Sequence, residues 1–388
     1  MRYTLGSSSI GDLEKEYVRK VLDDNFISPG PVVQEVEKET ARLHGMKHGL
    51  ALNSGQSAIH VAIQAIAETR LKGRRPLVAV PACTYISTLA AAVLAGCDIV
   101  LVDVEVPSAN MCPDSLKSVL NDAMLSGRPV DIVVPVHLFG KACSPRVFQV
   151  CKESDVWVVE DACESTFAPE MGKGHILTTS FFSNHLISAG GGGVIMTNDH
   201  ALDHYCWKLI NHGRSGRFGN DDIHQIADKF HFDEWGHSMK WSDVPAAIAK
   251  AQIERRDELY GARKRNAKAF NDNLKELEDT GLIQRPNTAG HTFMVYPIVL
   301  SDKLDANNII RDLNDNGIEI RRMMPITNQP VVQNYFGGTL ETEFPNAHRL
   351  NQQGFYVGVH PELTLHEIDA MSEIIKEAIA KEARGDNR

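Results

Sequence analysis

The sequence predicts an α/β protein with a large domain on a mixed, mainly parallel sheet and a smaller C-terminal α/β domain. Over the first half of the chain, short β-branched runs alternate with helical segments. Runs such as Asp98–Val102 are apolar at successive positions, which is typical of parallel strands covered on both faces. A chain of 388 residues suits two domains. We place them at residues 1–240 and 241–388, the second beginning with a long linking helix.

The individual elements follow from hydrophobic periodicity and from turn signals. A helix follows the capping-box-like sequence Ser9–Asp12, and a second begins at Pro31 and ends at Gly45. A long charged helix is expected at residues 242–277. The remaining expected strands are 49–52, 76–80, 98–102, 131–136, 156–160, 176–182, 194–197, 294–299 and 319–323, and the remaining helices are 58–67, 87–95, 111–125, 145–152, 201–210, 304–314 and 365–381.

Polar loops follow five of the expected strands. In a parallel sheet, ligands bind beyond the carboxyl ends of the strands, so these loops should meet in one place. The loops are Asn53–Ser57, Pro81–Tyr85, His137, Asp161–Glu164 and Ser180–His185. They predict a single site assembled from five segments.

Composition limits the possible partners and compartment. A net charge of −10 with no block of basic residues argues against nucleic acid. No apolar run reaches 18 residues and the N-terminus lacks the apolar stretch of a signal peptide, so we expect no membrane association. Seven scattered cysteines without a C-x-x-C pair are typical of a reduced, cytoplasmic protein. Cys143 and Cys151 are eight positions apart without a further pair, which indicates a metal or iron–sulfur site only weakly, and we expect none.

Three of the loops carry side chains with a possible chemical role. The segment Asn53–Ser57 precedes a helix, whose N-terminus could bind a phosphate, although it could equally be a capped turn. Tyr85 could stack on a planar ring, or could be a half-buried loop residue. Asp161 ends a buried strand, where a carboxylate is costly unless paired. It could pair with a protonated ring nitrogen, or cap the segment that follows.

His185 lies in the turn that leads to four glycines, Gly190–Gly193. Glycines are costly in entropy and are used where the backbone turns sharply or approaches another group. A histidine there could be a general base, a metal ligand or an ordinary polar turn residue. No further ligands accompany it at metal spacing, and the adjacent glycines favour a site role.

Taken together, the loops resemble those of the DegT/StrS-type sugar aminotransferases, which are pyridoxal-phosphate enzymes of fold type I. The resemblance covers nearly the whole chain, and the order of the segments is more specific than any one of them. The matching segments are Asn53–Ala58, Pro81–Tyr85, Val136–Gly140, Glu160–Glu164, Ser180–Phe182, the glycine run, Asn211–Arg214, Ala246–Gln252, Phe344–Pro345 and Val357–Pro361.

The resemblance implies a role for most of the loop residues. It implies a homodimer with shared active sites, in which the cofactor is pyridoxal or pyridoxamine phosphate. The phosphate would be held by Gly55, Gln56 and Ser180. Tyr85 would stack on the pyridine ring, and Asp161 would pair with its nitrogen, keeping the ring an electron sink. Glu164 would lie close to the ring edge.

The sequence departs from the aminotransferase pattern at His185, where the family has the lysine that bonds covalently to the cofactor. Histidine cannot form that bond, but it can be a general base. This substitution, together with Gly354–His360, resembles the GDP-4-keto-6-deoxymannose 3-dehydratase branch. In that branch pyridoxamine phosphate, held non-covalently, serves to remove the C3 hydroxyl of a 4-keto sugar.

Two further segments depart from the family pattern. The run Gly190–Gly193 has Gly191 where the family has a glutamate. The segment that reaches the phosphate of the partner subunit has Ser238 in place of asparagine and Lys240 in place of arginine. In the glycine-rich loop, Arg214 and Arg217 could contact a substrate diphosphate, or could form a solvated basic loop.

Three functions are compatible with these residues. The first is a 3-dehydratase, or deoxygenase, that acts on a keto sugar, which we expect to be nucleotide-linked, with His185 as base. The second is amino transfer from glutamate, with a native or deliberately introduced histidine. The third is a non-catalytic binding or regulatory homologue. His185 on an otherwise recognisable cofactor site favours the first.

Overall fold

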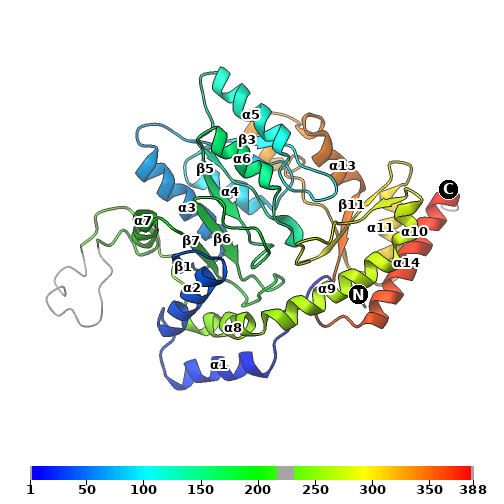
Figure 1. The fold of residues 1–388 in the computed structure, drawn as a ribbon, viewed down its shortest axis with the longest axis horizontal. Helices are drawn as coiled ribbons and strands as arrows, with labels where there is room; N and C mark the ends of the chain where they lie inside the picture. The colour runs from blue at the N-terminus through cyan, green and yellow to red at the C-terminus, as the bar shows by residue number, and fades with distance from the viewer. Residues whose placement is uncertain (1, 216–230, 386–388) are drawn as a thin grey trace.

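A computed structural model of the chain describes residues 2–215 and 231–385 and confirms the α/β class. A seven-stranded sheet has the order β1-β7-β6-β5-β4-β2-β3, and a four-stranded sheet has the order β10-β11-β9-β8 (Figure 1). In the larger sheet only β7 runs antiparallel to its neighbours. The mainly parallel arrangement therefore places the loops after β1, β2, β4, β5 and β6 at one edge.

The strands are short, and most of them are buried along their whole length. Those of the larger sheet are His48–Leu52 (β1), Leu77–Pro81 (β2), Asp98–Val102 (β3), Ile132–Val133 (β4), Trp157–Asp161 (β5), Ile176–Ser180 (β6) and Gly193–Thr197 (β7). Those of the smaller sheet are Ile283–Gln284 (β8), Tyr296–Leu300 (β9), Ile320–Arg322 (β10) and Gly354–Val357 (β11). The sequence did not predict β8 or β11, which are too short and too mixed in pattern to stand out.

Helices cover the larger sheet and continue into the smaller unit (Figure 1). They are Asp12–Asp23 (α1), Pro31–Leu43 (α2), Gly55–Arg70 (α3), Ile86–Leu94 (α4), Pro113–Leu125 (α5), Pro145–Glu153 (α6), His200–Ile210 (α7), Asp243–Glu254 (α8), Arg256–Asn273 (α9), Lys275–Asp279 (α10), Ala306–Asp315 (α11), Pro330–Phe336 (α12), Pro345–Gln353 (α13) and Leu365–Arg384 (α14). No helix of the described residues is long and apolar enough to cross a membrane.

The sequence did not predict α12 or α13, and two further details of the helices differ from the prediction. The expected helix at 242–277 is broken at Arg255 and Leu274, because α8 packs against α1 and α2 whereas α9 packs against α14 (Figure 1). The charged residues of 242–277 follow a helical pattern throughout, so the sequence does not reveal that the two halves pack against different helices. The N-cap of α1 is Gly11 rather than Ser9, and the Gly11 N–H donates to the Glu14 carboxylate at 2.8 Å.

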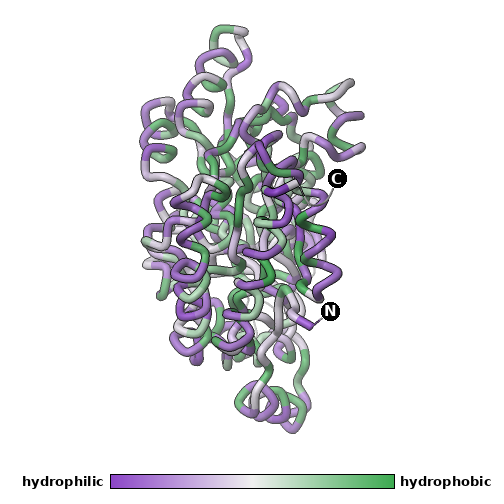
Figure 2. Tube along the Cα trace, turned by 90° about the vertical axis from the view of Figure 1, so that its right-hand side faces the viewer, coloured by the Kyte–Doolittle hydropathy of each residue, from purple (hydrophilic) through white to green (hydrophobic). Residues whose placement is uncertain are grey.

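One of the hydrophobic clusters spans both sheets. Residues of the smaller unit, including Val299, Met323 and Tyr356, pack into the same cluster as the fully buried side chains of α3. Figure 2 shows hydrophobic segments through the centre of the molecule and hydrophilic stretches along the outer helices. The smaller unit therefore contributes side chains next to the loop edge of the larger sheet. We propose that the domain boundary lies near residue 240, just before α8.

Asp243 ties the start of α2 to the start of α8, and its loss should destabilise the protein. The carboxylate is 2% exposed and accepts N–H groups of Gly30 at 2.9 Å and Val33 at 3.0 Å. We expect Asp243→Ala to lower the free energy of unfolding by about 2 kcal/mol, because it removes a helix cap. Chemical denaturation measures this, with the exposed Asp257→Ala as control. Equal stability of the two variants would contradict this role.

Candidate active site

The structure places a cavity of about 430 Å³ at the carboxyl ends of β1, β2, β5 and β6. Four of the five predicted loops contribute side chains to it, including those of Gln56, Tyr85, Asp161 and His185. The fifth contributes through Val136 and Leu138 rather than through His137. The His137 ring is fully buried, and its Nε2 lies 2.9 Å from a Glu160 oxygen. The five loops therefore meet at one cavity, as expected, with His137 in a structural role; that this cavity is the active site stays a prediction.

Helix α3 begins at the cavity wall. Ser54 is the N-cap, and its Oγ accepts the N–H of Ser57 at 3.1 Å. The two preceding helical residues, Gly55 and Gln56, line the cavity. A helix N-terminus presents N–H groups and the positive end of the dipole, which suits an anion. The sequence left a capped turn and an anion site as alternatives, and the two are compatible here. The cap uses only the N–H of Ser57, the third residue of α3, so the N–H groups of Gly55 and Gln56 remain for an anion.

Gly55 is required by its neighbours. A Cβ at this position would lie 2.6 Å from the Ser180 Cβ and 2.7 Å from the Cys163 Sγ. Both distances are shorter than van der Waals contact, so Ser180 or Cys163 would have to move. The absence of a side chain therefore lets three loops meet at the start of α3.

We expect Gly55→Ala to weaken phosphate binding and to cost about 1–3 kcal/mol of stability, because Ser180 and Cys163 must move. Inorganic phosphate or pyridoxal phosphate titration and thermal unfolding measure the two effects. The matched control is Gly191→Ala, where a Cβ would meet only the Asn53 oxygen at 3.6 Å, an ordinary contact. Unchanged phosphate affinity in Gly55→Ala would show that this helix start is not the phosphate site.

Within the glycine run, sterics explain why residue 192 is a glycine. Its φ is +115°, and a Cβ would lie 2.5 Å from the Trp241 ring. Gly191 has neither a positive φ nor a close neighbour. The backbone at 191 would therefore accept the family's glutamate, and nothing in the structure explains its replacement by glycine.

Asp161 is fixed at the end of β5. It is 3% exposed, and its two carboxylate oxygens accept the Thr88 hydroxyl at 2.8 Å and the Cys163 N–H at 3.1 Å. The bond to Cys163 closes a turn and is not a helix cap, because residues 162–175 form no helix. The bond to Thr88 holds the carboxylate in a set orientation at the cavity wall. Such a group can also pair with a cationic ring nitrogen.

Glu164 is a second buried carboxyl group of the cavity. It is 8% exposed, and one oxygen accepts the N–H of Phe139 at 3.0 Å. Burial, with a smaller contribution from the charge of Asp161, raises the pKa of Glu164 from 4.5 to about 7. This side chain can therefore carry a proton near neutral pH.

The raised pKa makes a prediction for stability. The folded chain binds the Glu164 proton more tightly than the unfolded chain, so its contribution is complete below about pH 4.5 and is lost as the pH rises to about 7. Between pH 5 and 7.5, the cofactor-free wild type should lose about 2–3 kcal/mol relative to Glu164→Gln. Urea unfolding at the two pH values measures this, with the exposed Glu343→Gln as control. A pH-independent difference would contradict the buried, protonated carboxyl.

His185 occupies the turn after β6. Its N–H donates to the Phe182 carbonyl at 3.0 Å, and the Ser188 hydroxyl donates to the His185 carbonyl at 3.1 Å. The imidazole is half-buried against the edge of the Phe182 ring, and its Nδ1 is buried without a partner. Burial, assisted by the charge of Arg263, lowers the pKa of His185 to about 4. The imidazole is thus neutral at pH 7 and can accept a proton.

Tyr85 lies at the cavity mouth. It is the N-cap of α4, and its side chain is 60% exposed although it lines the cavity. The chain's own residues therefore leave a ring face available for stacking. The half-buried loop tyrosine that the sequence also allowed is not what the structure shows.

The smaller unit contributes residues that sequence reasoning missed. Met294, Met324 and Tyr356 line the cavity, as does Leu5 near the N-terminus. Leu5, Met294 and Met324 come from distant segments that carry no polar motif, so no pattern in the sequence indicated them. Tyr356 lies within Gly354–His360, the segment that resembles the dehydratase branch, although the sequence assigned no role to this residue.

The remaining predicted residues lie elsewhere. Among the described residues that line the cavity, neither Ser238 nor Arg214 occurs. Ser238 pairs through its backbone with Asn211, and the Arg214 guanidinium lies 5.9 Å from the centre of the Phe232 ring. Arg217 falls outside the described residues. Contacts of these side chains with a substrate or a second subunit stay predictions.

The site can be compared with known proteins. Residues 8–376 match the DegT/DnrJ/EryC1/StrS aminotransferase family. Among curated proteins, the chain is 29% identical over 380 residues to a GDP-perosamine synthase of Caulobacter vibrioides, covering 95% of this chain and 96% of the relative. It is 26% identical over 395 residues to a GDP-4-keto-6-deoxy-D-mannose 3-dehydratase of Escherichia coli O55:H7, covering 97% and 100%.

Solved structures share the whole fold. The Escherichia coli GDP-4-keto-6-deoxy-D-mannose 3-dehydratase with bound hydrated pyridoxal phosphate superimposes with a TM-score of 0.86 at 24% identity, covering 97% of this chain and 99% of that one. The Helicobacter pylori aminotransferase PseC gives 0.87 at 17% identity, covering 98% and 100%. These matches confirm the fold type I architecture predicted for both the large sheet and the smaller unit.

Proposed function

Because the chain belongs to the DegT/DnrJ/EryC1/StrS aminotransferase family, and is therefore a pyridoxal-phosphate-dependent enzyme, we propose that it removes the C3 hydroxyl of a 4-keto sugar nucleotide. The observation that carries the proposal is the imidazole of His185 in the cavity wall, with its buried Nδ1 unpartnered, where the family has its covalent lysine. A relative over the full length of the chain bears the name of such a dehydratase.

The residues of the cavity fit the cofactor. The start of α3 at Gly55 and Gln56, with the Ser180 hydroxyl, would hold the phosphate. The exposed ring of Tyr85 would stack on the pyridine. Asp161, already oriented by Thr88, would pair with the ring nitrogen. The orphaned Nδ1 of His185 is the kind of buried polar atom that a ligand satisfies.

When bound, pyridoxamine phosphate supplies an amine and an electron-withdrawing ring. His185 takes a proton at its free nitrogen, because its low pKa leaves the imidazole unprotonated. Glu164, which can carry a proton near neutral pH, lies in the same cavity and can donate a hydrogen bond. Asp161 keeps its negative charge against the ring. With no lysine at 185, the cofactor is held non-covalently.

Amino transfer from glutamate is the second candidate. It is favoured by the identity of 29% to a protein named GDP-perosamine synthase. In that case His185 would move the proton without anchoring the cofactor. Elimination at C3 remains the better proposal. Without a covalent bond to the chain, the cofactor can dissociate and rebind either as pyridoxal phosphate or as pyridoxamine phosphate.

The substrate and assembly also belong to the proposal. A second copy of the chain would bring its Ser238 to the phosphate, which gives a homodimer with shared active sites. We place the enzyme in the cytoplasm. Arg214 and Arg217 would contact the diphosphate of the sugar nucleotide. Glutamate would regenerate the amine form of the cofactor.

The test uses native protein, pyridoxamine phosphate and a panel of 4-keto-6-deoxy sugar nucleotides, with mass spectrometry of the products. Deoxygenation gives a sugar one oxygen atom lighter, together with ammonia and pyridoxal phosphate. Amino transfer instead replaces the ketone oxygen by an amino group. A panel in which only the amino product forms would replace the first candidate by the second, and no product from any sugar would refute both.

A further inference from the structure

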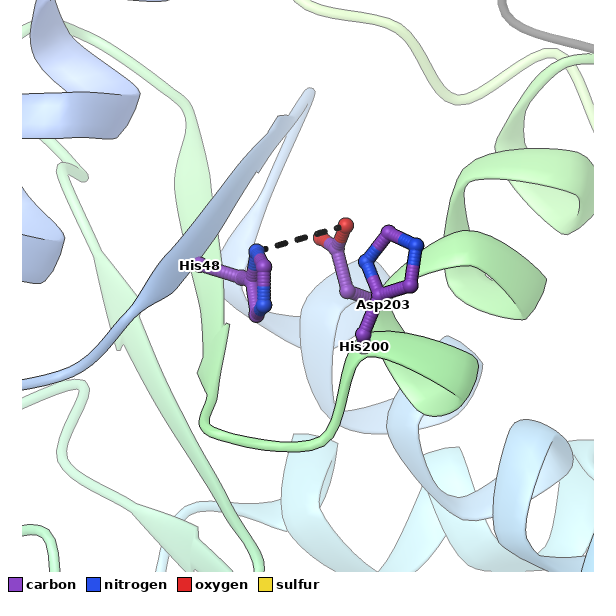
Figure 3. A group of neighbouring side chains, drawn as sticks. All are labelled: His48, His200 and Asp203. Carbon is purple, nitrogen blue, oxygen red and sulfur yellow. Dashed lines mark ion pairs between the residues drawn. The ribbon is translucent and has the colours of Figure 1, made fainter.

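A cluster of two histidines and one aspartate lies at the end of β1 opposite the cavity. The His48 Nδ1 is 3.9 Å from the Asp203 Oδ2, and one ligand atom from each of His48, His200 and Asp203 lies within 4.8 Å of the others. Figure 3 shows the His48 ring projecting from β1 toward Asp203, with His200 beside it at the start of α7. We propose that these three side chains bind a divalent transition-metal cation, with zinc as the best fit.

The ligand types select the metal. Two imidazoles and one carboxylate suit zinc and its neighbours, whereas magnesium and calcium prefer oxygen ligands alone. Metal–ligand bonds of about 2.0–2.2 Å in a tetrahedral site place the ligand atoms roughly 3.4 Å apart. The present separations exceed this by at most about 1.4 Å, which rotation of the two imidazoles can provide, since His48 is half-buried and His200 exposed.

The backbone that carries the ligands is held in place independently. His48 opens β1 and pairs with Thr197 of β7. His200 and Asp203 are three residues apart in α7, so they share one helix face. The start of α7 is fixed by Asp199, which accepts the N–H of Ala201 at 2.8 Å and that of Leu202 at 3.1 Å. Binding therefore needs side-chain adjustment only.

The surroundings set the strength of the site. A cavity of about 350 Å³ beside His48 and Asp203 leaves room for a water molecule as fourth ligand. Lys38, Arg42 and Lys47 line the same cavity, and their positive charges oppose a cation. We expect one cation per chain with a dissociation constant on the order of micromolar. Because β1 is the edge strand of the larger sheet, the cation would tie this edge to α7 and raise the melting temperature.

The experiment titrates tag-free, chelator-stripped protein with zinc chloride by calorimetry and records thermal unfolding with and without zinc. The wild type should bind one equivalent and gain thermal stability. His48→Ala and His200→Ala should each lower the affinity at least about tenfold, since removing a ligand costs no less than removing an outer partner. The exposed His366→Ala in α14 is the matched control and should bind as the wild type does.

The histidine variants keep the test decisive even if the buried Asp203 cannot be replaced without unfolding. Cobalt(II) substitution adds an independent readout, because its visible absorption reports tetrahedral nitrogen and oxygen ligands. Binding that is substoichiometric in the wild type, or unchanged in both His48→Ala and His200→Ala, would overturn the proposal.

Discussion

Replacing His185 by asparagine should lower the turnover of the keto sugar by about 10³-fold with little change in KM, because a positioned general base contributes about 10²–10⁴-fold. The asparagine fits the same half-buried turn, whose hydrogen bonds run through the backbone of Phe182, His185 and Ser188. The fold and cofactor affinity should therefore be retained. Single-turnover kinetics with pyridoxamine phosphate, beside equilibrium cofactor titration, separate the two quantities.

A second variant at the same position gives a readout that does not depend on turnover. Pyridoxal phosphate should leave the native protein on dialysis. In His185→Lys it should become covalently attached, which borohydride reduction and mass spectrometry of the intact chain detect. The exposed His366→Asn is the control for both experiments. Full turnover in His185→Asn would remove His185 from the chemistry, and failure of His185→Lys to trap the cofactor would place it away from the reactive carbon.

Most of the site could be predicted from the sequence because its loops obey a topological rule. Gly55 and His185 follow strands and Asp161 ends one, and parallel strands end at one edge. Local signals were sufficient for this: a helix start, a strand-terminal carboxylate and a glycine turn. What they could not give was the pKa of Glu164 or His185, because burial depends on how distant segments pack.

The cavity residues that the smaller unit contributes could not be predicted from the sequence for the same reason. Met294 and Met324 are apolar residues of segments without a motif, and only packing against the shared hydrophobic cluster brings them to the cavity. The break at Arg255 likewise follows from α8 and α9 packing against different partners. His48 and His200 are 152 positions apart, so no spacing rule for metal ligands could join them. Tertiary packing, rather than local propensity, decides each of these features.

Replacing Asp161 by asparagine should lower turnover by at least about 10³-fold, because a neutral amide cannot hold a proton on the cofactor ring nitrogen. The amide oxygen can still accept from either Thr88 or Cys163, so the site should keep its shape. The measurement combines turnover with the absorbance spectrum of bound pyridoxal phosphate, which should shift toward that of the unprotonated ring. The spectral change isolates the charge pair from a general loss of structure.

Thr88→Val is the matched control, since it removes one neutral hydrogen bond to the same carboxylate while leaving its charge. That bond contributes about 1 kcal/mol, so turnover should fall only about fivefold and the spectrum should stay that of the protonated ring. A graded series, slight for Thr88→Val and severe for Asp161→Asn, follows if charge is the essential contribution of Asp161. Equal losses in the two variants would instead mean that orientation of the carboxylate matters more than its charge, and the pairing with the ring nitrogen would have to be abandoned.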